Sequence, residues 1–321
     1  MASPPVKKFH GRRAGRADPP GDHVRDSRGV RGSAMTNPAP AFAARPASLL
    51  GDSPWRNYSC KLGEFNAFAE PELRRLIAGA GLKPGMRILD AGCGAGDALP
   101  WLLEEAGPSG SVIGLDLSTA HVQAAGRYTG ARIQVVQGDL LDAPIATKSV
   151  DFIWCVNTIN HLRDPAHGVR QLAALLRPGG RIALGQSALL PDMVFAWDSK
   201  LERATNEAVH SYYRDRYSLT EGDLKAVRAL LGILRAANLQ NVTVQTILIE
   251  RVSPVDQVTE RYLRNTLFRD TWGERLRPYL SSEDYAELVR LCDPHQEQFA
   301  LRRADFHFLQ SFSLAVGNIQ P

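Results

Sequence analysis

The most constraining feature of this sequence is a short apolar strand that runs directly into a glycine-rich turn. Met86–Ala91 reads as a buried β-strand, and Gly92, Gly94 and Gly96 follow it at alternate positions. Glycine tolerates positive φ and lets a ligand approach the backbone closely. Such a turn between a strand and a helix is typical of the ligand-binding edge of an open α/β sheet.

The chain on both sides of this turn alternates between short apolar runs and amphipathic helical patterns, which is typical of parallel βα units. Further strands are predicted at residues 112–116, 133–137, 150–156, 181–186, 242–250 and 306–316. Together with the first strand they predict a Rossmann-like α/β fold with a seven-stranded, mostly parallel sheet and helices on both faces.

Residues 1–50 differ in composition from the rest of the chain. They are rich in Pro, Gly and Arg, and they carry the excess of basic side chains behind the net charge of +4. We expect this segment to be a disordered basic tail, because it cannot bury enough apolar surface to offset the entropy of ordering it. The remaining residues are close to neutral, which argues against a nucleic-acid partner.

Other compositional features exclude several classes of protein. No stretch of 18 apolar residues occurs, so no membrane-spanning helix is expected. The four cysteines are widely spaced and do not cluster with histidines. This spacing argues against a disulfide scaffold and a metal site, and it suits a reducing compartment such as the cytoplasm.

The glycine-rich turn could serve either of two cofactors. A dinucleotide fingerprint requires a small residue at position 97, where this chain has Asp97. A carboxylate there would face a pyrophosphate unfavourably. Asp90, two residues before the first glycine, would instead favour a cationic ligand.

The segment Asp90–Gly96 resembles the first motif of the class I S-adenosylmethionine (SAM)-dependent methyltransferases. Four further segments resemble this family in the same order, namely 112–118, 137–140, 152–162 and 176–182. The resemblance covers residues 86–187. Within the family, the sequence pattern is most similar to that of ubiquinone-biosynthesis-like and secondary-metabolite methyltransferases. It implies that SAM is the cofactor.

The resemblance also implies a role for each matching residue. Asp116 would accept hydrogen bonds from both ribose hydroxyls, although it could simply cap the following helix. Asp139 would accept from the adenine amine with the Leu140 backbone alongside, or it could be an ordinary turn residue. Leu117 would pack on the adenine ring, or belong to the core.

The methionyl end of SAM would lie at the glycine-rich turn. Asp90 would orient the methionyl amine through water or organise the turn, and Gly92, Gly94 and Gly96 would give the turn its shape. The backbone of Asn157 would contact the methionyl group, which does not require the amide side chain.

His161 is the candidate general base, because it follows the fourth strand near the expected methyl donor and an imidazole has a suitable pKa. The alternative is a structural or substrate-shaping histidine. No metal ligand set is expected.

Two inserts would form a helical cap over the site. The first is rich in aromatic residues, and its side chains could build a pocket for a planar or apolar acceptor: Trp197, His210, Tyr212, Tyr213 and Tyr217. A small auxiliary core is the alternative. The predicted boundaries are a tail (1–50), the SAM-binding core (51–187), the aromatic insert (188–218), a core helix and strand six (219–250), a helical insert (251–304) and the last core strand (305–321).

The sequence therefore predicts a SAM-dependent methyltransferase (EC 2.1.1.-) that transfers a methyl group to a small organic acceptor by in-line displacement. The alternatives are an NAD(P)-dependent oxidoreductase, which Asp97 opposes, and a non-catalytic SAM-binding regulator.

Overall fold

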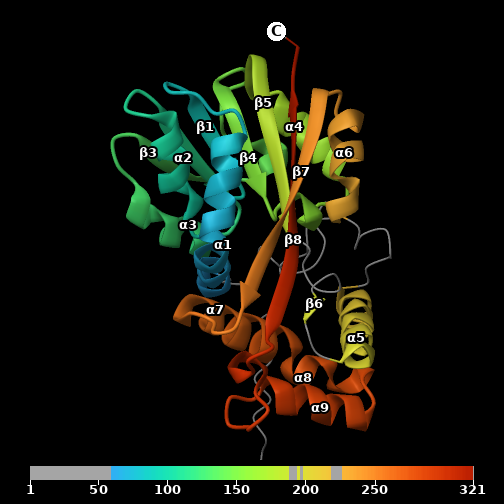
Figure 1. Ribbon diagram of the computed structural model, residues 1–321. Coiled ribbons are helices and arrows are strands. Elements are labelled where there is room, and N and C mark those ends of the chain that lie inside the picture. Colours follow the sequence, from blue (N-terminus) through green and yellow to red (C-terminus); the bar gives the residue numbers. More distant parts are fainter. Residues whose placement is uncertain (1–58, 188–193, 196–197, 218–225, 321) are drawn as a thin grey trace, which may run out of the picture. The chain divides into compact units, whose positions relative to one another are not determined.

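The computed structural model describes residues 59–187, 194–195, 198–217 and 226–320 (Figure 1). The tail predicted at 1–50 lies outside these ranges. The described strands form one sheet in the order β3–β2–β1–β4–β5–β8–β6, and β7 also pairs with β8. Their bounds are β1 (Arg87–Ala91), β2 (Ser111–Asp116), β3 (Ile133–Gln137), β4 (Val150–Val156), β5 (Leu176–Ser187), β6 (Val194–Phe195), β7 (Gln240–Val252) and β8 (His307–Asn318).

The strand directions confirm the predicted Rossmann-like α/β class. Strands β1 to β5 pair in parallel, whereas β8 is antiparallel to β5, β6 and β7. The two-residue β6 makes the sheet eight-stranded where seven strands were expected. A pairing of two residues carries almost no periodicity, so the sequence gives no sign of it.

Strand β5 also begins earlier than the predicted start at Arg181. Val150 of β4 already pairs with Leu176, and the register shifts before the next pair, Phe152 with Arg181. The glycine-containing turn between these two pairs is therefore an irregularity within the strand.

Helices cover both faces of the sheet, as the near-continuous apolar strands require. Neighbouring residues of β1 point to opposite faces, and both are fully buried: Ile88 packs with α1, α2 and α3, and Leu89 packs with α4 and α6. The bounds of these helices are α1 (Ser59–Gly79), α2 (Ala98–Ala106), α3 (Thr119–Ala125), α4 (Pro165–Ala173) and α6 (Ala226–Ala236).

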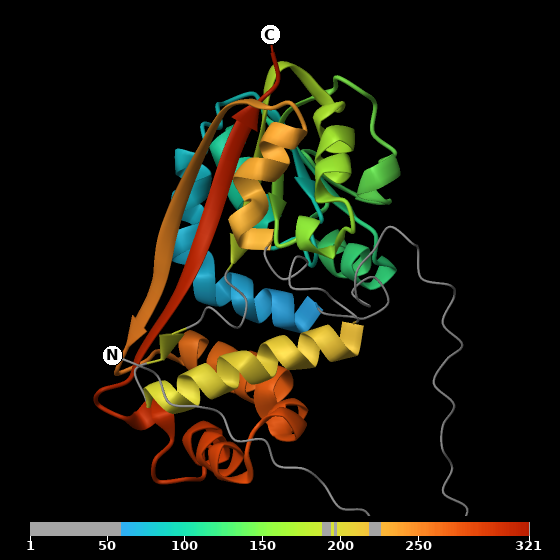
Figure 2. The same ribbon diagram turned by 90° about the vertical axis from the view of Figure 1, so that its right-hand side faces the viewer.

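A second group of helices comes from the two inserts (Figure 2). It contains α5 (Ser199–Tyr217), α7 (Gln257–Arg261), the π-helix η6 (Tyr262–Trp272), α8 (Gly273–Leu276) and α9 (Ser282–Cys292). Helix α5 packs along α8 and α9, and Lys200 of α5 pairs with Asp284 of α9 at 3.1 Å. We call this group the helical cap.

Strands β7 and β8 form a long antiparallel ribbon that continues past β5 toward the helical cap (Figure 1). Near its far end, Arg251 of β7 reaches α1 and pairs with Glu72 at 2.8 Å. The pair lies against Phe68, whose ring is 4.6 Å from the guanidinium carbon. The ribbon is therefore anchored to α1 where it leaves the core sheet.

No helix in the described ranges is both long and apolar enough to cross a membrane.

Candidate active site

The glycine-rich turn lies where the order of strands reverses, since β1 has β2 on one side and β4 on the other. Open α/β sheets bind their ligands at this switch point. Gly92, Gly94 and Gly96 all have positive φ, at 80°, 53° and 83°. A Cβ atom at Gly92 would lie 2.3 Å from Thr158 Oγ1, and one at Gly94 would lie 2.8 Å from Leu62 Cδ1. At these glycine positions a side chain is excluded both by the backbone conformation and by neighbouring side chains.

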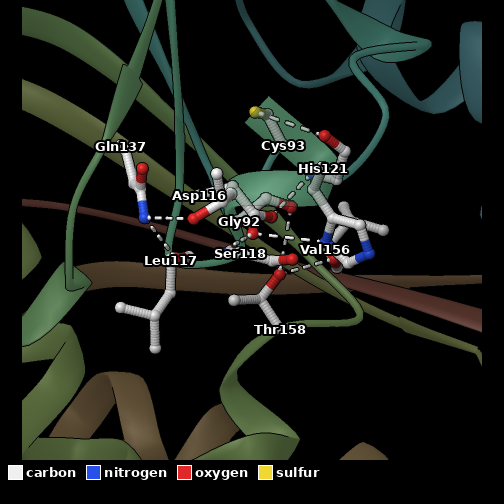
Figure 3. A network of polar contacts seen from close by, with 11 residues as sticks. Gly92, Cys93, Asp116, Leu117, Ser118, His121, Gln137, Val156 and Thr158 are labelled. Atoms are coloured by element: carbon white, nitrogen blue, oxygen red, sulfur yellow. Dashed lines mark hydrogen bonds and ion pairs between the residues drawn. The ribbon is translucent and has the colours of Figure 1, made fainter. Parts of the chain in front are cut away.

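Asp116, at the end of β2, is tied to this turn by its side chain (Figure 3). The Gly94 N–H donates to Asp116 Oδ2 at 2.8 Å, and the Ser118 N–H donates to Oδ1 at 2.9 Å. His121 Nδ1 lies 3.2 Å from the same Oδ1. The side chain of Asp116 is only 12% exposed, so these contacts replace most of its water.

These contacts limit what Asp116 can still accept. A carboxylate offers about four lone-pair sites, and three donors already point at it. One site on Oδ2 remains for a ligand hydroxyl. Acceptance from both ribose hydroxyls would require one present donor to move away.

Asp90 is buried beneath the turn at the end of β1 and is 3% exposed. Burial raises the pKa of this carboxyl to about 8, and the nearby charges of Asp116 and Asp97 add to the rise. Three carboxyl groups thus surround one glycine-rich turn. A cationic ligand would relieve their mutual repulsion, whereas a pyrophosphate would increase it.

Asp97 follows the turn and lies at the start of α2. Asn66 Nδ2 of α1 donates to its Oδ2 at 3.1 Å, and Arg127 Nη2 donates to its Oδ1 at 2.6 Å. The Tyr128 hydroxyl donates to the same Oδ1 at 3.3 Å. These contacts tie the turn to the first part of α1, which also places Leu62 against Gly94.

The remaining predicted cofactor residues follow β2, β3 and β4. The Leu141 N–H donates to Asp139 Oδ1 at 2.9 Å, so this carboxylate caps the short helix η3 (Leu140–Asp142). Leu140 packs with the core around α4, and Leu117 is half-buried. Asn157 has a positive φ of 51°, and its Oδ1 accepts from Ser187 N–H at 2.9 Å. The amide of Asn157 therefore joins the ends of β4 and β5.

His161 ends the short helix η4 (Ile159–His161) after β4 and is half-buried. The backbone N–H of His161 donates to the Thr158 carbonyl at 3.0 Å. Thr158 Oγ1 in turn donates to the Val156 carbonyl at 2.9 Å. This loop, the glycine-rich turn and the Asp116 network therefore lie at the same edge of the sheet (Figure 3).

Comparison with known proteins identifies the domain that this edge belongs to. The sequence model of a family described as "Methyltransferase domain" matches residues 88–180. Residues 88–180 therefore form a methyltransferase domain. SAM is the cofactor that domains of this class use, and the match begins inside β1 and extends into β5.

Several curated proteins resemble parts of the chain. A 37.1 kDa protein of transposon Tn4556 from Streptomyces fradiae is 37% identical, covering 36% of this chain and 32% of the relative. The 27-O-demethylrifamycin SV methyltransferase of Amycolatopsis mediterranei is 31% identical, covering 49% and 62%. A demethylmenaquinone methyltransferase of Staphylococcus carnosus is 30% identical, covering 39% and 53%. The chain thus spans less than two thirds of the length of each of these relatives.

The residues predicted to form the acceptor pocket lie only partly within the described structure. Trp197 lies outside the described residues, and so does the side chain of Tyr217. Tyr212 contacts Tyr213 edge-on at 5.4 Å and Tyr279 at 6.3 Å between ring centroids. Within the described part of the chain, these two tyrosines therefore pack inside the helical cap. His210, on the same helix, has a buried Nδ1 with no hydrogen-bond partner among the described residues.

Two residues of the methyltransferase domain were not predicted from the sequence. Thr158 closes over Gly92, and His121 contacts Asp116. His121 is the third residue of α3, whose N-cap is Ser118, and side chains at that position point back toward the helix start. That spacing is the only sequence signal that could have revealed it. Across the described ranges, no group of three or more His, Cys, Asp or Glu side chains could hold a metal ion.

Proposed function

We propose that the whole chain is a SAM-dependent methyltransferase that methylates a small organic acceptor. One observation carries this proposal: the Gly94 N–H donates to Asp116 Oδ2 at 2.8 Å, which joins the glycine-rich turn after β1 to the carboxylate that ends β2. This arrangement offers a close-approach backbone surface for a methionyl group beside an acceptor for a ribose hydroxyl.

The residues around the turn fit SAM in charge as well as in shape. SAM, when bound, supplies an electrophilic methyl group on a cationic sulfonium. Asp97 and Asp116 would stabilise that positive charge, and Asp116 would also hold the ribose. Asp90 would orient the methionyl amine. Asp139 and Leu140 would flank the adenine, and the Asn157 backbone would contact the methionyl group. Asp97 is held by Arg127 and Asn66 at the position where a dinucleotide site needs a small residue.

The chain's main contribution to the reaction would be alignment. A nucleophile must meet the methyl group in line with the departing sulfur, and water must be kept away. The loop that carries His161 lies beside the turn and would position the acceptor. His161 would accept a proton only from an acceptor that still carries one. The acceptor pocket would include His210, with Trp197 and Tyr217 as further candidates.

The class of acceptor follows from the relatives. Two of them are named for a rifamycin and a menaquinone precursor, which are both small molecules. We extend this class of acceptor to the present chain. We propose no nucleic-acid partner for the protein, and we assign the protein to the cytoplasm.

Binding experiments separate the methyltransferase from an oxidoreductase. The full chain should bind SAM with a one-to-one stoichiometry in a calorimetric titration and give no change in NADH fluorescence. Binding of NADH without binding of SAM would contradict the proposal.

A transfer experiment separates the enzyme from a non-catalytic SAM-binding regulator. The full chain is incubated with methyl-labelled SAM and a bacterial small-molecule extract, with the Asp116→Ala variant as the control. Label should enter an organic-soluble product only with the parent chain. Tight SAM binding with no labelled product above the control would favour the regulator.

A further inference from the structure

His121 lies next to Asp116, the carboxylate proposed to bind the ribose. The proposed function does not by itself explain why a histidine lies there. Its Nδ1 lies 3.2 Å from Asp116 Oδ1, and the two side chains are only 9% and 12% exposed. The contact joins the start of α3 to the end of β2 (Figure 3). A polar contact with so little exposure is held by its surroundings, because water cannot replace either partner easily.

The direction of the hydrogen bond follows from the other contacts of Asp116. Backbone N–H groups of Gly94 and Ser118 donate to its two oxygens, one to each. This is the pattern of an ionised carboxylate, which only accepts. His121 Nδ1 must therefore carry a proton and donate it, so the contact fixes both the imidazole tautomer and the plane of the carboxylate.

Stabilisation of the helix start is the competing explanation. A residue at the third helical position can bond back to the N-cap and satisfy a free N–H group there. The Ser118 N-cap of α3 has no side-chain cap hydrogen bond, and the Nδ1 contact of His121 is to a carboxylate rather than to the helix backbone. The contact thus acts on Asp116.

We propose that His121 is a positioning residue for the cofactor, a role that rests on the proposed function. It holds the Asp116 carboxylate in the orientation in which the remaining lone pair of Oδ2 meets a ribose hydroxyl of SAM. Without this donor, only the backbone N–H groups of Gly94 and Ser118 would hold the carboxylate, so its orientation would be less tightly fixed. A bound SAM would then have to restore the orientation at a cost in affinity.

A double-mutant cycle tests this role directly, because it asks whether His121 acts through Asp116. Dissociation constants for SAM are measured by calorimetry for the parent, His121→Leu, Asp116→Ala and the double variant, with melting temperatures for each. We expect His121→Leu to weaken SAM binding about tenfold. The double variant should bind no more weakly than Asp116→Ala alone, since the residue through which His121 acts is already absent.

Two further variants separate positioning from a general structural effect. His121→Asn keeps a donor near the place of Nδ1 and should restore binding to within about threefold of the parent. His295→Leu removes an exposed histidine from the segment that follows α9 and should leave SAM affinity unchanged.

Several results would overturn the proposal. One is a double variant whose loss equals the product of the two single losses, because His121 would then act independently of Asp116. Another is a His121→Leu variant that binds SAM as tightly as the parent or more tightly. If His121→Leu does not fold, a His121→Asn variant with parental melting temperature and tenfold weaker binding would overturn it. A parent chain that binds no SAM would refute the proposed function itself.

Discussion

Three carboxyl groups lie around the glycine-rich turn, and a single substitution can test whether the most deeply buried one is protonated. Asp90 is the most deeply buried of them, and burial together with Asp116 and Asp97 raises its pKa to about 8. The unfolded chain would ionise Asp90 near the ordinary pKa of 3.8. Between these two values the folded state holds a proton that the unfolded state has lost. Folding is therefore penalised progressively as pH rises through this window.

Asp90→Asn should remove this penalty, because an amide stays neutral at every pH. The parent's free energy of unfolding should fall relative to that of Asp90→Asn by about 1 kcal/mol per pH unit between pH 5 and 7. Urea unfolding of both proteins without ligand at pH 5, 6 and 7 measures the difference. A difference that stays constant over this range would show that Asp90 ionises normally in the folded chain.

His161 is a second residue whose role a single substitution can decide. A sulfonium leaving group departs as a neutral sulfide, so the reaction demands little proton transfer. We expect His161→Gln to retain SAM affinity and, with an identified acceptor, to keep the methylation rate within a few-fold of the parent from pH 6 to 9. A fall of roughly 10²–10⁴ that shrinks as pH rises would instead make His161 a general base.

At the scale of elements, α1 connects the methyltransferase domain to the rest of the described chain. Its first turns contact Gly94 and Asp97, while Glu64 accepts hydrogen bonds from Asn265 and Thr266 of the π-helix η6. Long π-helices are rare and concentrate at functional positions. One helix therefore contacts both the glycine-rich turn and the helical cap.

Further along α1, the Arg251–Glu72 pair holds the β7–β8 ribbon. Both side chains are largely buried, at 18% and 10% exposure. Arg251→Met should lower the free energy of unfolding by about 2 kcal/mol, because it leaves the Glu72 charge buried without its partner. Arg264→Met removes an exposed pair with Glu260 and should cost less than about 1 kcal/mol. Urea unfolding compares the two, and equal losses would contradict a specific anchoring role for Arg251.

The elements also show how far sequence reasoning reaches. The strands before and after the glycine-rich turn could be predicted because both faces of a parallel sheet are covered, which makes each strand an uninterrupted apolar run. The positive φ of Gly92 was likewise expected from its place between strand and helix. These are local properties, and local patterns encode them.

Contacts between distant segments could not be predicted in this way. The pairing of β6 with β8 involves two residues of each strand, and the π-helical hydrogen bonding of η6 has no distinct residue period. The Asp97–Asn66 contact depends on how α1 packs against the glycine-rich turn. Each is decided by tertiary structure, so its residues looked ordinary in the sequence.

At the scale of the whole molecule, the described residues from Ser59 onward form one compact unit in which the core sheet and the helical cap share the β7–β8 ribbon. Every proposal above requires that SAM binds at one edge of this sheet, over the glycine-rich turn. Ligand binding should therefore slow amide exchange locally in this unit rather than throughout it.

Hydrogen–deuterium exchange of the full chain with and without saturating SAM tests this most directly. SAM is predicted to protect peptides covering residues 92–97 and 116–121 by the largest factors, with smaller effects at 157–161. Peptides from α9 should exchange at the same rate in both samples, because α9 lies in the helical cap away from the turn. Protection confined to the cap, or no protection at 92–97 and 116–121 under conditions where SAM binds, would contradict the assignment of this edge as the cofactor site.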